Sequence, residues 1–256
     1  GCWDRLDIQH ELPAGAARNA LDCAFWDLEA RRKGKRIWQL LGAPSPSPIT
    51  TAYTLSLDTP TSMGRAACKE NWRPLLKIKL GQEGDLERVA AVRKNAPNAR
   101  LIVDANEGWS LAELEKKSCQ FASLGVDLIE QPLPAAQDSA LDQFTHAVPL
   151  CADESCHTSD DIERIANRYE FVNIKLDKTG GLTEALAVKE AAQLEGMGIM
   201  VGCMVGTSLS MAPAFFLAQQ VDYVDLDGPL LLEKDRDPGL QYEGSLLHPP
   251  EAKVWG

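Results

Sequence analysis

One stretch of the chain decides the fold class: residues 100–130 read RLIVDANEGWSLAELEKKSCQFASLGVDLIE. A short apolar run at 100–104 is followed by a helical pattern at 111–124 and by a second apolar run at 127–130. Apolar runs without polar alternation are typical of strands that are covered on both faces, as in parallel sheets. The stretch therefore predicts one strand–helix–strand unit with parallel strands.

The same unit repeats along most of the chain. Short apolar strands alternate with helical stretches such as 86–95 and 182–195, which gives eight strands, seven intervening helices and no helix after the last strand. This pattern predicts an α/β fold, a (β/α)7β barrel similar to a TIM barrel. The alternative, an open doubly wound sheet, needs a phosphate-binding turn after its first strand, and none is present there. The strands are expected at 51–57, 75–79, 100–104, 127–130, 150–153, 171–175, 199–201 and 223–226.

The segments outside the repeat do not show this alternation of strands and helices. Residues 18–33 read as a helix that stops at Gly34, and residues 37–41 read as a shorter one. The Ala-Pro-Ser-Pro-Ser-Pro segment 43–48 is a linker. We predict three parts, which are helices and linker in 1–48, the barrel in 49–228, and an irregular tail in 229–256 that packs back on the preceding structure.

The composition narrows the possible function classes. The chain has 26 Lys and Arg against 37 Asp and Glu, and its net charge of −11 disfavours binding to nucleic acid or to an anionic membrane. Its seven cysteines, Cys2 among them, form no C-x-x-C motif, which indicates a reduced, cytoplasmic protein without a disulfide framework or zinc site. The uncharged stretch between Glu195 and Asp222 contains several glycines and a proline, and it is expected to be a buried strand and helix rather than a membrane span.

Polar residues at the ends of the predicted strands are the candidates for chemistry. Active sites of such barrels lie at the C-terminal ends of the strands. Three successive strands end in carboxylates, Asp104, Glu130 and Asp153. One Asp at a strand end is commonly only the N-cap of the next helix, but three in succession favour a metal site. Oxygen ligands without Cys or His select Mg²⁺ rather than zinc.

Two lysines complete the predicted chemistry. Lys79 ends the second strand and Lys175 the sixth, and strand alternation directs both into the barrel mouth, together with Lys77, Asp225 and Asp227. The second and sixth strands stand opposite each other in an eight-stranded barrel, so the two amines can approach one substrate carbon from opposite faces. With a metal to stabilise the developing charge, this predicts removal and return of a proton α to a carboxylate, with inversion of that carbon.

These residues resemble the enolase superfamily and, within it, the dipeptide epimerases. In that family a capping domain precedes the barrel and some of its strands precede the helix at 18–33, so residues 1–48 are expected to be a remnant of this α+β domain. The matching segments are Lys-Ile-Lys-Leu (77–80), Val-Asp-Ala-Asn-Glu-Gly-Trp (103–109), Ile-Glu-Gln-Pro-Leu (129–133), Cys-Ala-Asp-Glu-Ser-Cys-His-Thr (151–158), Asn-Ile-Lys-Leu-Asp-Lys-Thr-Gly-Gly-Leu (173–182), Gly-Cys-Met (202–204) and Asp-Leu-Asp-Gly-Pro (225–229).

The resemblance implies a role for each of these positions. The implied roles are Mg²⁺ ligands at Asp104, Glu130 and Asp153, acid/base lysines at Lys79 and Lys175, a hold on the substrate carboxylate at Lys77, an ammonium-binding pair at Asp225 and Asp227, and substrate-lining positions at Thr54 and Cys203.

The function implied is Mg²⁺-dependent epimerisation of the C-terminal residue of a dipeptide such as L-Ala-L-Glu, in peptidoglycan peptide recycling. Asp225 and Asp227 favour this substrate, because two aspartates need a cation to face. The alternatives are a superfamily lyase or cycloisomerase, of the muconate cycloisomerase or o-succinylbenzoate synthase type, and a non-catalytic domain that binds metal and carboxylate. The expected partner is a small dipeptide, with no nucleic acid and no membrane, and the oligomeric state, a homo-oligomer included, is left open.

Overall fold

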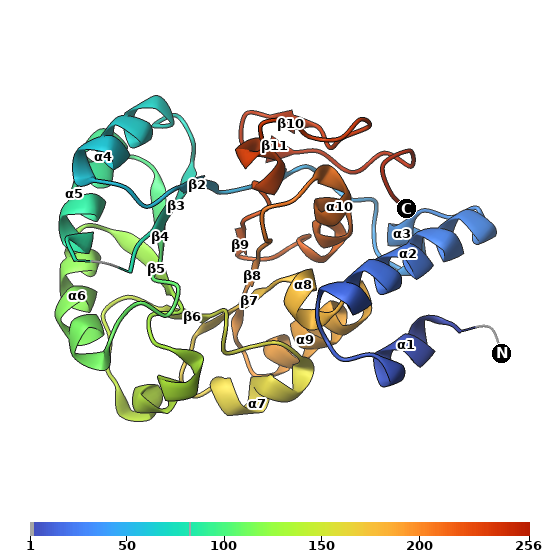
Figure 1. Ribbon diagram of the computed structural model, residues 1–256, viewed down its shortest axis with the longest axis horizontal. Coiled ribbons are helices and arrows are strands. Elements are labelled where there is room, and N and C mark those ends of the chain that lie inside the picture. Colours follow the sequence, from blue (N-terminus) through green and yellow to red (C-terminus); the bar gives the residue numbers. More distant parts are fainter. Residues whose placement is uncertain (1–2, 82) are drawn as a thin grey trace. The chain divides into compact units, whose positions relative to one another are not determined.

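A computed structural model describes residues 3–81 and 83–256, so Cys2 lies outside the described residues. The chain divides into two compact units. Unit 1 comprises Gly1–Thr51, His157–Ile162 and Ile174–Gly256, and unit 2 comprises Ala52–Cys156 and Glu163–Asn173. Each unit contains parallel strands that are separated by helices (Figure 1). The predicted α/β class is therefore confirmed.

Unit 2 carries the first part of the parallel sheet, in which neighbouring strands are consecutive in sequence. Figure 1 shows α4, α5 and α6 along the outer side of these strands. The strands are β2 Tyr53–Leu55, β3 Leu75–Lys79, β4 Arg100–Asp104, β5 Val126–Glu130, β6 Leu150–Ala152 and β7 Phe171–Ile174, whose last residue belongs to unit 1. The helices of unit 2 are α4 Pro60–Lys69, α5 Asp85–Asn95, α6 Leu111–Ser123, the 3-10 helix η1 Ala135–Gln143 and α7 Ile162–Ile165. The first residue of α7 and the 3-10 helix η2 Ser159–Asp161 that precedes it belong to unit 1.

The packing of unit 2 explains why its strands read as apolar runs. Ile78, Val103 and Ile129 lie on neighbouring strands in direct register and are completely buried. Burial of such a side chain contributes roughly 1.5–3 kcal/mol. Along each strand, the residues that alternate with these three point to the opposite face of the sheet. Toward the strand ends, the residues on that face are charged rather than apolar. The two faces of the sheet therefore have different chemistry.

Unit 1 contains the long N-terminal helices and the end of the barrel repeat. Helix α2 ends at Gly34, whose positive φ of 60° suits glycine, and the Gly34 N–H bonds to the last carbonyls of the helix. Strands β8 and β9 are parallel and pair Met200 with Tyr223. The elements are α1 Arg5–Glu11, α2 Ala16–Lys33, α3 Ile37–Leu40, β1 Ile49–Thr50, α8 Leu176–Thr179, α9 Leu182–Leu194, β8 Gly198–Val201, α10 Ser208–Leu217, β9 Tyr223–Val224, η3 Gly228–Leu231, β10 Tyr242–Glu243 and β11 Leu246–Leu247.

The uncharged stretch before Asp222 forms β8 and the buried helix α10, as predicted. In the part of the chain that the structure describes, no helix is both long enough and apolar enough to span a membrane. All eight predicted strands are present, and the first and the last are clearly shorter than expected. The linker at 43–48 contains neither helix nor strand.

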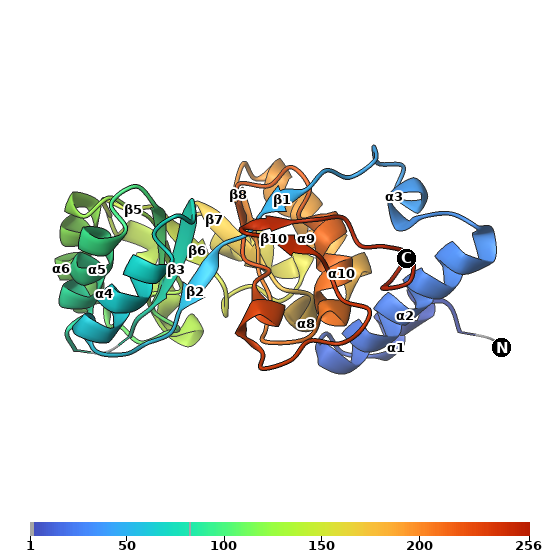
Figure 2. The same cartoon turned by 90° about the horizontal axis from the view of Figure 1, so that it is seen from above.

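The C-terminal tail is more ordered than predicted. Strands β10 and β11 form a hairpin whose edge pairs with β1, in the antiparallel order β1-β11-β10 (Figures 1 and 2). The prediction of irregular structure is therefore wrong for residues 242–247. Strands of two residues are too short to show alternation, and the clearest sequence signal is the turn glycine Gly244, with φ 61°. The tail does pack back on α2, where Trp255 Nε1 donates to Cys23 O at 3.0 Å.

Candidate active site

The three predicted metal ligands lie on one face of unit 2. In the parallel register Asp104 pairs with Glu130, and Glu130 pairs with Cys151, two residues before Asp153. Paired residues face the same side of a sheet, and so do residues two apart on one strand. All three carboxylates are buried. The register thus places Asp104 and Glu130 side by side at the C-terminal ends of β4 and β5, and Asp153, directly after β6, lies close enough to influence Asp104.

Two lysines of β3 lie against these acids. Lys77 Nζ is 2.7 Å from Glu130 Oε2 and 3.1 Å from Asp104 Oδ2, and Lys79 Nζ is 2.6 Å from the same oxygen of Asp104. The Lys77 side chain is 2% exposed, whereas that of Lys79 is 31% exposed. Lys77 therefore bridges two acids from within, and Lys79 is the amine of this pair that a substrate can reach.

The charges of this cluster stabilise one another. Burial raises the pKa of Asp104 and so does the nearby Asp153, but the ammonium groups of Lys77 and Lys79 outweigh both and hold the pKa of Asp104 below its ordinary value. Asp104 is consequently ionised at neutral pH. An ionised acid next to an ammonium is the arrangement in which a carboxylate can bind a cation or orient a lysine.

The donor set fits a hard divalent cation. It consists of carboxylate oxygens only, and the neutral amide of Asn173 donates to Glu130 Oε1 at 2.8 Å, which orients that carboxylate. Among residues 3–81 and 83–256, no three His, Cys, Asp or Glu side chains converge closely enough to hold a metal ion as they stand.

Gln131 organises the loop that carries Asp153, a role that no sequence pattern indicated. Its completely buried side chain accepts hydrogen bonds from the backbone N–H groups of Asp153 (2.8 Å) and Ser155 (3.1 Å). Its Nε2 lies within hydrogen-bond distance of Leu133 O (2.9 Å), Ser155 Oγ (2.8 Å) and Tyr169 Oη (3.1 Å). The backbone of Gln131 has φ 34°, an uncommon value for a residue other than glycine. Glutamine thus joins the ends of β5 and β6.

Asn106 and Thr54 border the lysines. Asn106 Oδ1 accepts from Lys79 Nζ at 2.9 Å, and the Asn106 N–H donates to Asp104 Oδ1 at 3.0 Å. Thr54 pairs with Lys77 in the parallel register, so it shares the face of the lysines. The substrate-lining position predicted for Thr54 is consistent with this facing. No role was predicted for Asn106, although it lies within the matching segment 103–109.

The remaining predicted residues belong to unit 1. Lys175 directly follows β7 with an extended backbone (φ −119°, ψ 126°) and is buried. Cys203 follows β8 and is half-buried. Asp225 and Asp227 are both buried on either side of Leu226, and the Asp225 N–H donates to Val201 O at 2.8 Å.

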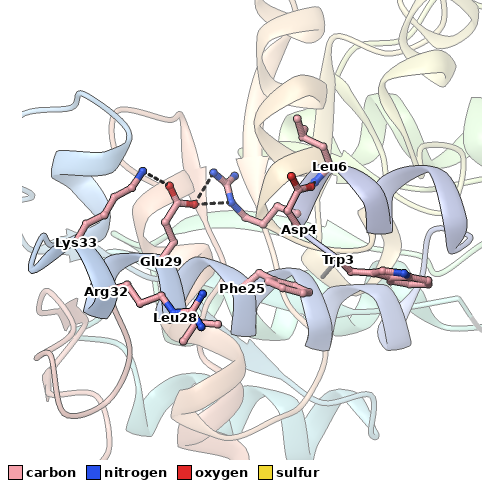
Figure 3. Close-up of a pocket in the computed structure, with 9 residues that line it drawn as sticks. Trp3, Asp4, Leu6, Phe25, Leu28, Glu29, Arg32 and Lys33 are labelled. Carbon is pink, nitrogen blue, oxygen red and sulfur yellow. Dashed lines mark hydrogen bonds and ion pairs between the residues drawn. The ribbon is translucent and has the colours of Figure 1, made fainter. Parts of the chain in front are cut away.

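A separate surface pocket of about 460 Å³ lies between α1 and α2 in unit 1 (Figure 3). Glu29 in this pocket pairs with Lys33 at 2.6 Å and with Arg5 at 2.8 Å. Its lining combines apolar side chains with charged groups of both signs and comprises Trp3, Asp4, Arg5, Leu6, Phe25, Leu28, Glu29, Arg32 and Lys33. None of the predicted site residues lines it.

Two family models match the chain. The C-terminal model, described as "Enolase C-terminal domain-like", matches residues 42–253. The N-terminal model, described as "Mandelate racemase / muconate lactonizing enzyme, N-terminal domain", matches residues 4–42. Together they span almost the whole chain.

Individual relatives are similar at high identity. An N-acetyl-D-glutamate racemase of Pseudoalteromonas sp. is 49% identical over 98% of this chain and 79% of its own length. The L-Ala-D/L-Glu epimerase of Escherichia coli is 48% identical over 95% of this chain and 77% of its own length. A crystal structure of an enolase family member from Agrobacterium tumefaciens with homology to dipeptide epimerases, with bound sodium and L-Ala-L-Glu, is 53% identical and has a TM-score of 0.97, covering 99% of this chain and 78% of that one. This likeness extends over both units and confirms the predicted barrel class.

Proposed function

Since this chain belongs to the enolase superfamily, we propose that it is a Mg²⁺-dependent isomerase that epimerises the C-terminal residue of a dipeptide such as L-Ala-L-Glu. The relatives at 48–49% identity bear the names of an epimerase and a racemase, both of which invert one carbon of a glutamate derivative. A role in recycling peptidoglycan peptides follows from that substrate class.

The observation that carries the proposal is the contact between Lys79 and Asp104. Both belong to a cluster of three acids and two lysines. An amine that removes a proton α to a carboxylate must be close to the group that stabilises the resulting charge. Lys79 Nζ lies 2.6 Å from Asp104 Oδ2 and is partly exposed. Base and charge-stabilising site are therefore adjacent.

We propose Asp104, Glu130 and Asp153 as the ligands of Mg²⁺, because they are buried oxygen donors on one face of adjacent strands. When bound, Mg²⁺ stabilises the negative charge that develops on the substrate carboxylate as the α-proton leaves. Lys77 would lie beside that carboxylate as a fixed ammonium, since its Nζ already faces Glu130 and Asp104.

Lys79 and Lys175 are proposed as the two acid/base groups. To act as the base, Lys79 takes the α-proton as a neutral amine. Asn173 faces Glu130, and Lys175 lies two residues farther along an extended backbone, so strand alternation supports the same facing for Lys175. One lysine removes the proton and the other returns it on the opposite face.

Asp225 and Asp227 are proposed to bind the ammonium of the dipeptide, with Thr54 and Cys203 lining the substrate. Two buried carboxylates separated by one residue suit a cation. A second candidate function is racemisation of an N-acylated glutamate, which the name of the Pseudoalteromonas relative favours. That substrate has no ammonium, so the aspartate pair is the feature that separates the two functions.

An exchange experiment tests the proposal. The protein is incubated with Mg²⁺ in D₂O with L-Ala-L-Glu or, separately, with N-acetyl-L-glutamate, and the glutamate α-position is followed by NMR. We expect deuterium to enter the dipeptide with inversion. Exchange confined to N-acetylglutamate would instead support the second function, and exchange in neither would contradict both.

Two broader features, the location of the protein and its division into domains, are also proposed. The scattered cysteine spacing, which contains no C-x-x-C motif, supports a reducing, cytoplasmic location. The boundary between the family models at residue 42 supports assigning 1–48 to a capping domain, 49–228 to the barrel and 229–256 to a tail.

A further inference from the structure

The backbone of Leu226 is held by two side-chain hydroxyl groups. Its N–H donates to Thr51 Oγ1 at 2.8 Å, and its carbonyl accepts from Tyr242 Oη at 2.8 Å. Leu226 is completely buried, so its polar groups need partners within the protein. The sheet supplies the preceding bond, from the Asp225 N–H to Val201 O. At Leu226, two side-chain hydroxyl groups therefore take the place of the hydrogen bonds between strands.

Both hydroxyl groups belong to one small frame. Thr51 directly follows β1, and its own N–H donates to Ser245 O in the turn of the β10–β11 hairpin at 2.9 Å. Tyr242 is the first residue of β10. Because β1 pairs with β11 and β11 with β10, the three-stranded sheet sets the positions of the two hydroxyls (Figure 2). The C-terminal tail thereby reaches the Asp225–Asp227 segment.

The Tyr242 phenol has the chemistry of a permanent donor. Burial raises its pKa, and the nearby acidic groups of Cys203, Asp227 and Asp235 raise it further. The phenol therefore stays protonated throughout the physiological range. A deprotonated oxygen would repel the Leu226 carbonyl and Asp227.

We propose that Thr51 and Tyr242 are positioning residues that set the directions of the Asp225 and Asp227 side chains and thereby the affinity for the substrate ammonium. Each hydroxyl fixes one of the two peptide planes that flank Leu226, and these planes determine where the neighbouring carboxylates point. A charge-assisted hydrogen bond depends on such alignment. The inference rests on the proposed function, because it deepens the ammonium site of that function.

The test removes each hydroxyl without changing shape. In Tyr242→Phe and in Thr51→Val we expect KM for L-Ala-L-Glu to rise about tenfold, as for a weakened hydrogen bond to a charged group. We expect kcat to stay within about twofold, because the reacting atoms are not touched. Thr50→Val, an exposed neighbour in β1, is the matched control and should leave both constants unchanged.

A double-mutant cycle shows whether the hydroxyls act through the aspartates. In a background that carries Asp225→Asn and Asp227→Asn, Tyr242→Phe should add little to KM. A full additional effect there, or a loss of kcat at constant KM in the single variants, would overturn the proposal and leave Tyr242 a purely structural residue.

Failure of the proposed function gives a different result. If the unaltered protein neither binds nor exchanges L-Ala-L-Glu, the proposed function is wrong. The proposed effect of the two hydroxyl groups on substrate affinity is then wrong as well. The hold on Leu226 is then judged by hydrogen exchange of its amide. Faster exchange in Thr51→Val supports the hold, and unchanged exchange contradicts it.

Discussion

The ammonium nitrogen of Lys77 lies 2.7 Å from Oε2 of Glu130, and both side chains are almost completely buried. Removing two charges from water costs several kcal/mol for each ion, which a close contact offsets only in part. The same Lys77 nitrogen also lies 3.1 Å from Asp104. One buried cation thus balances two acids, and this relationship makes the cluster sensitive to the loss of a single charge.

Replacing Lys77 by Met should destabilise the metal-free protein by about 3–5 kcal/mol, because two buried acids lose an ammonium partner. Mg²⁺ should restore more stability to Lys77→Met than to the unaltered protein, since the cation replaces the missing charge. Urea unfolding with and without Mg²⁺ measures both effects. Arg100→Met, which breaks a contact between the half-exposed side chains of Arg100 and Asp127, is the control, with an expected change of about 1 kcal/mol or less. An equal response of the two variants to Mg²⁺ would contradict the expectation.

Replacing Lys79 or Lys175 by Ala should slow epimerisation by about 10²–10⁴-fold, the usual contribution of a general acid or base. Each variant should still exchange the α-proton of one dipeptide stereoisomer through the remaining lysine. Exchange of L-Ala-L-Glu and L-Ala-D-Glu in D₂O, followed by NMR, separates these effects. Lys116→Ala, at an exposed position of α6, should behave like the unaltered protein. Near-normal epimerisation in both site variants would exclude a two-base mechanism.

Replacing Asp225 and Asp227 together by Asn should raise KM for L-Ala-L-Glu by about 10–100-fold, the value of a lost hydrogen bond between charged groups. The inhibition constant of N-acetyl-L-glutamate, which has no ammonium, should not increase. Steady-state kinetics with this acyl amino acid as competitor gives both numbers. An equal loss of affinity for the two compounds would show that Asp225 and Asp227 do not recognise the ammonium.

Replacing Gln131 by Leu should destabilise the protein and weaken Mg²⁺ binding. The backbone N–H groups of Asp153 and Ser155 lose their acceptor, at a cost of about 1–3 kcal/mol for each buried donor. Urea unfolding and a Mg²⁺ titration are the measurements. Gln137→Leu, at an exposed position of η1, should change neither quantity. Lower stability with unchanged Mg²⁺ affinity would mean that Gln131 supports the fold but does not orient Asp153.

The buried Asp22 predicts a pH dependence of stability. Burial is the largest influence and raises its pKa above 3.8, although Thr183 donates to both of its oxygens. The folded state therefore binds more protons than the unfolded state between pH 3.8 and the raised value, so this contribution to stability is present at low pH and is lost as the pH rises through that window. In Asp22→Asn this contribution to the slope should disappear, which urea unfolding at several pH values measures. A variant with the original slope would show that Asp22 is not its origin.

The strand ends and their acids could be predicted because both are recognised from patterns of neighbouring residues. Leu75–Lys79 and Arg100–Asp104 are apolar runs that end in charge, and parallel strands bring such ends to one edge. The hairpin of β10 and β11 could not be predicted, because two residues show no period and its partner β1 lies almost 200 positions earlier. Gln131 and Tyr242 were missed for the same reason, since their partners Asp153 and Leu226 lie 22 and 16 residues away.

The amino-acid sequence by itself determined which residues form strands and which chemistry those strands carry, since strand length, alternation and charge are properties of neighbouring residues. Only the tertiary structure decided that Lys77 is the buried cation and Lys79 the accessible one, although both are lysines on the same face of β3. It also decided that Gln131 holds the Asp153 loop and that the tail holds Leu226. Burial and hydrogen bonding between distant segments depend on packing, and packing is a property of the whole fold.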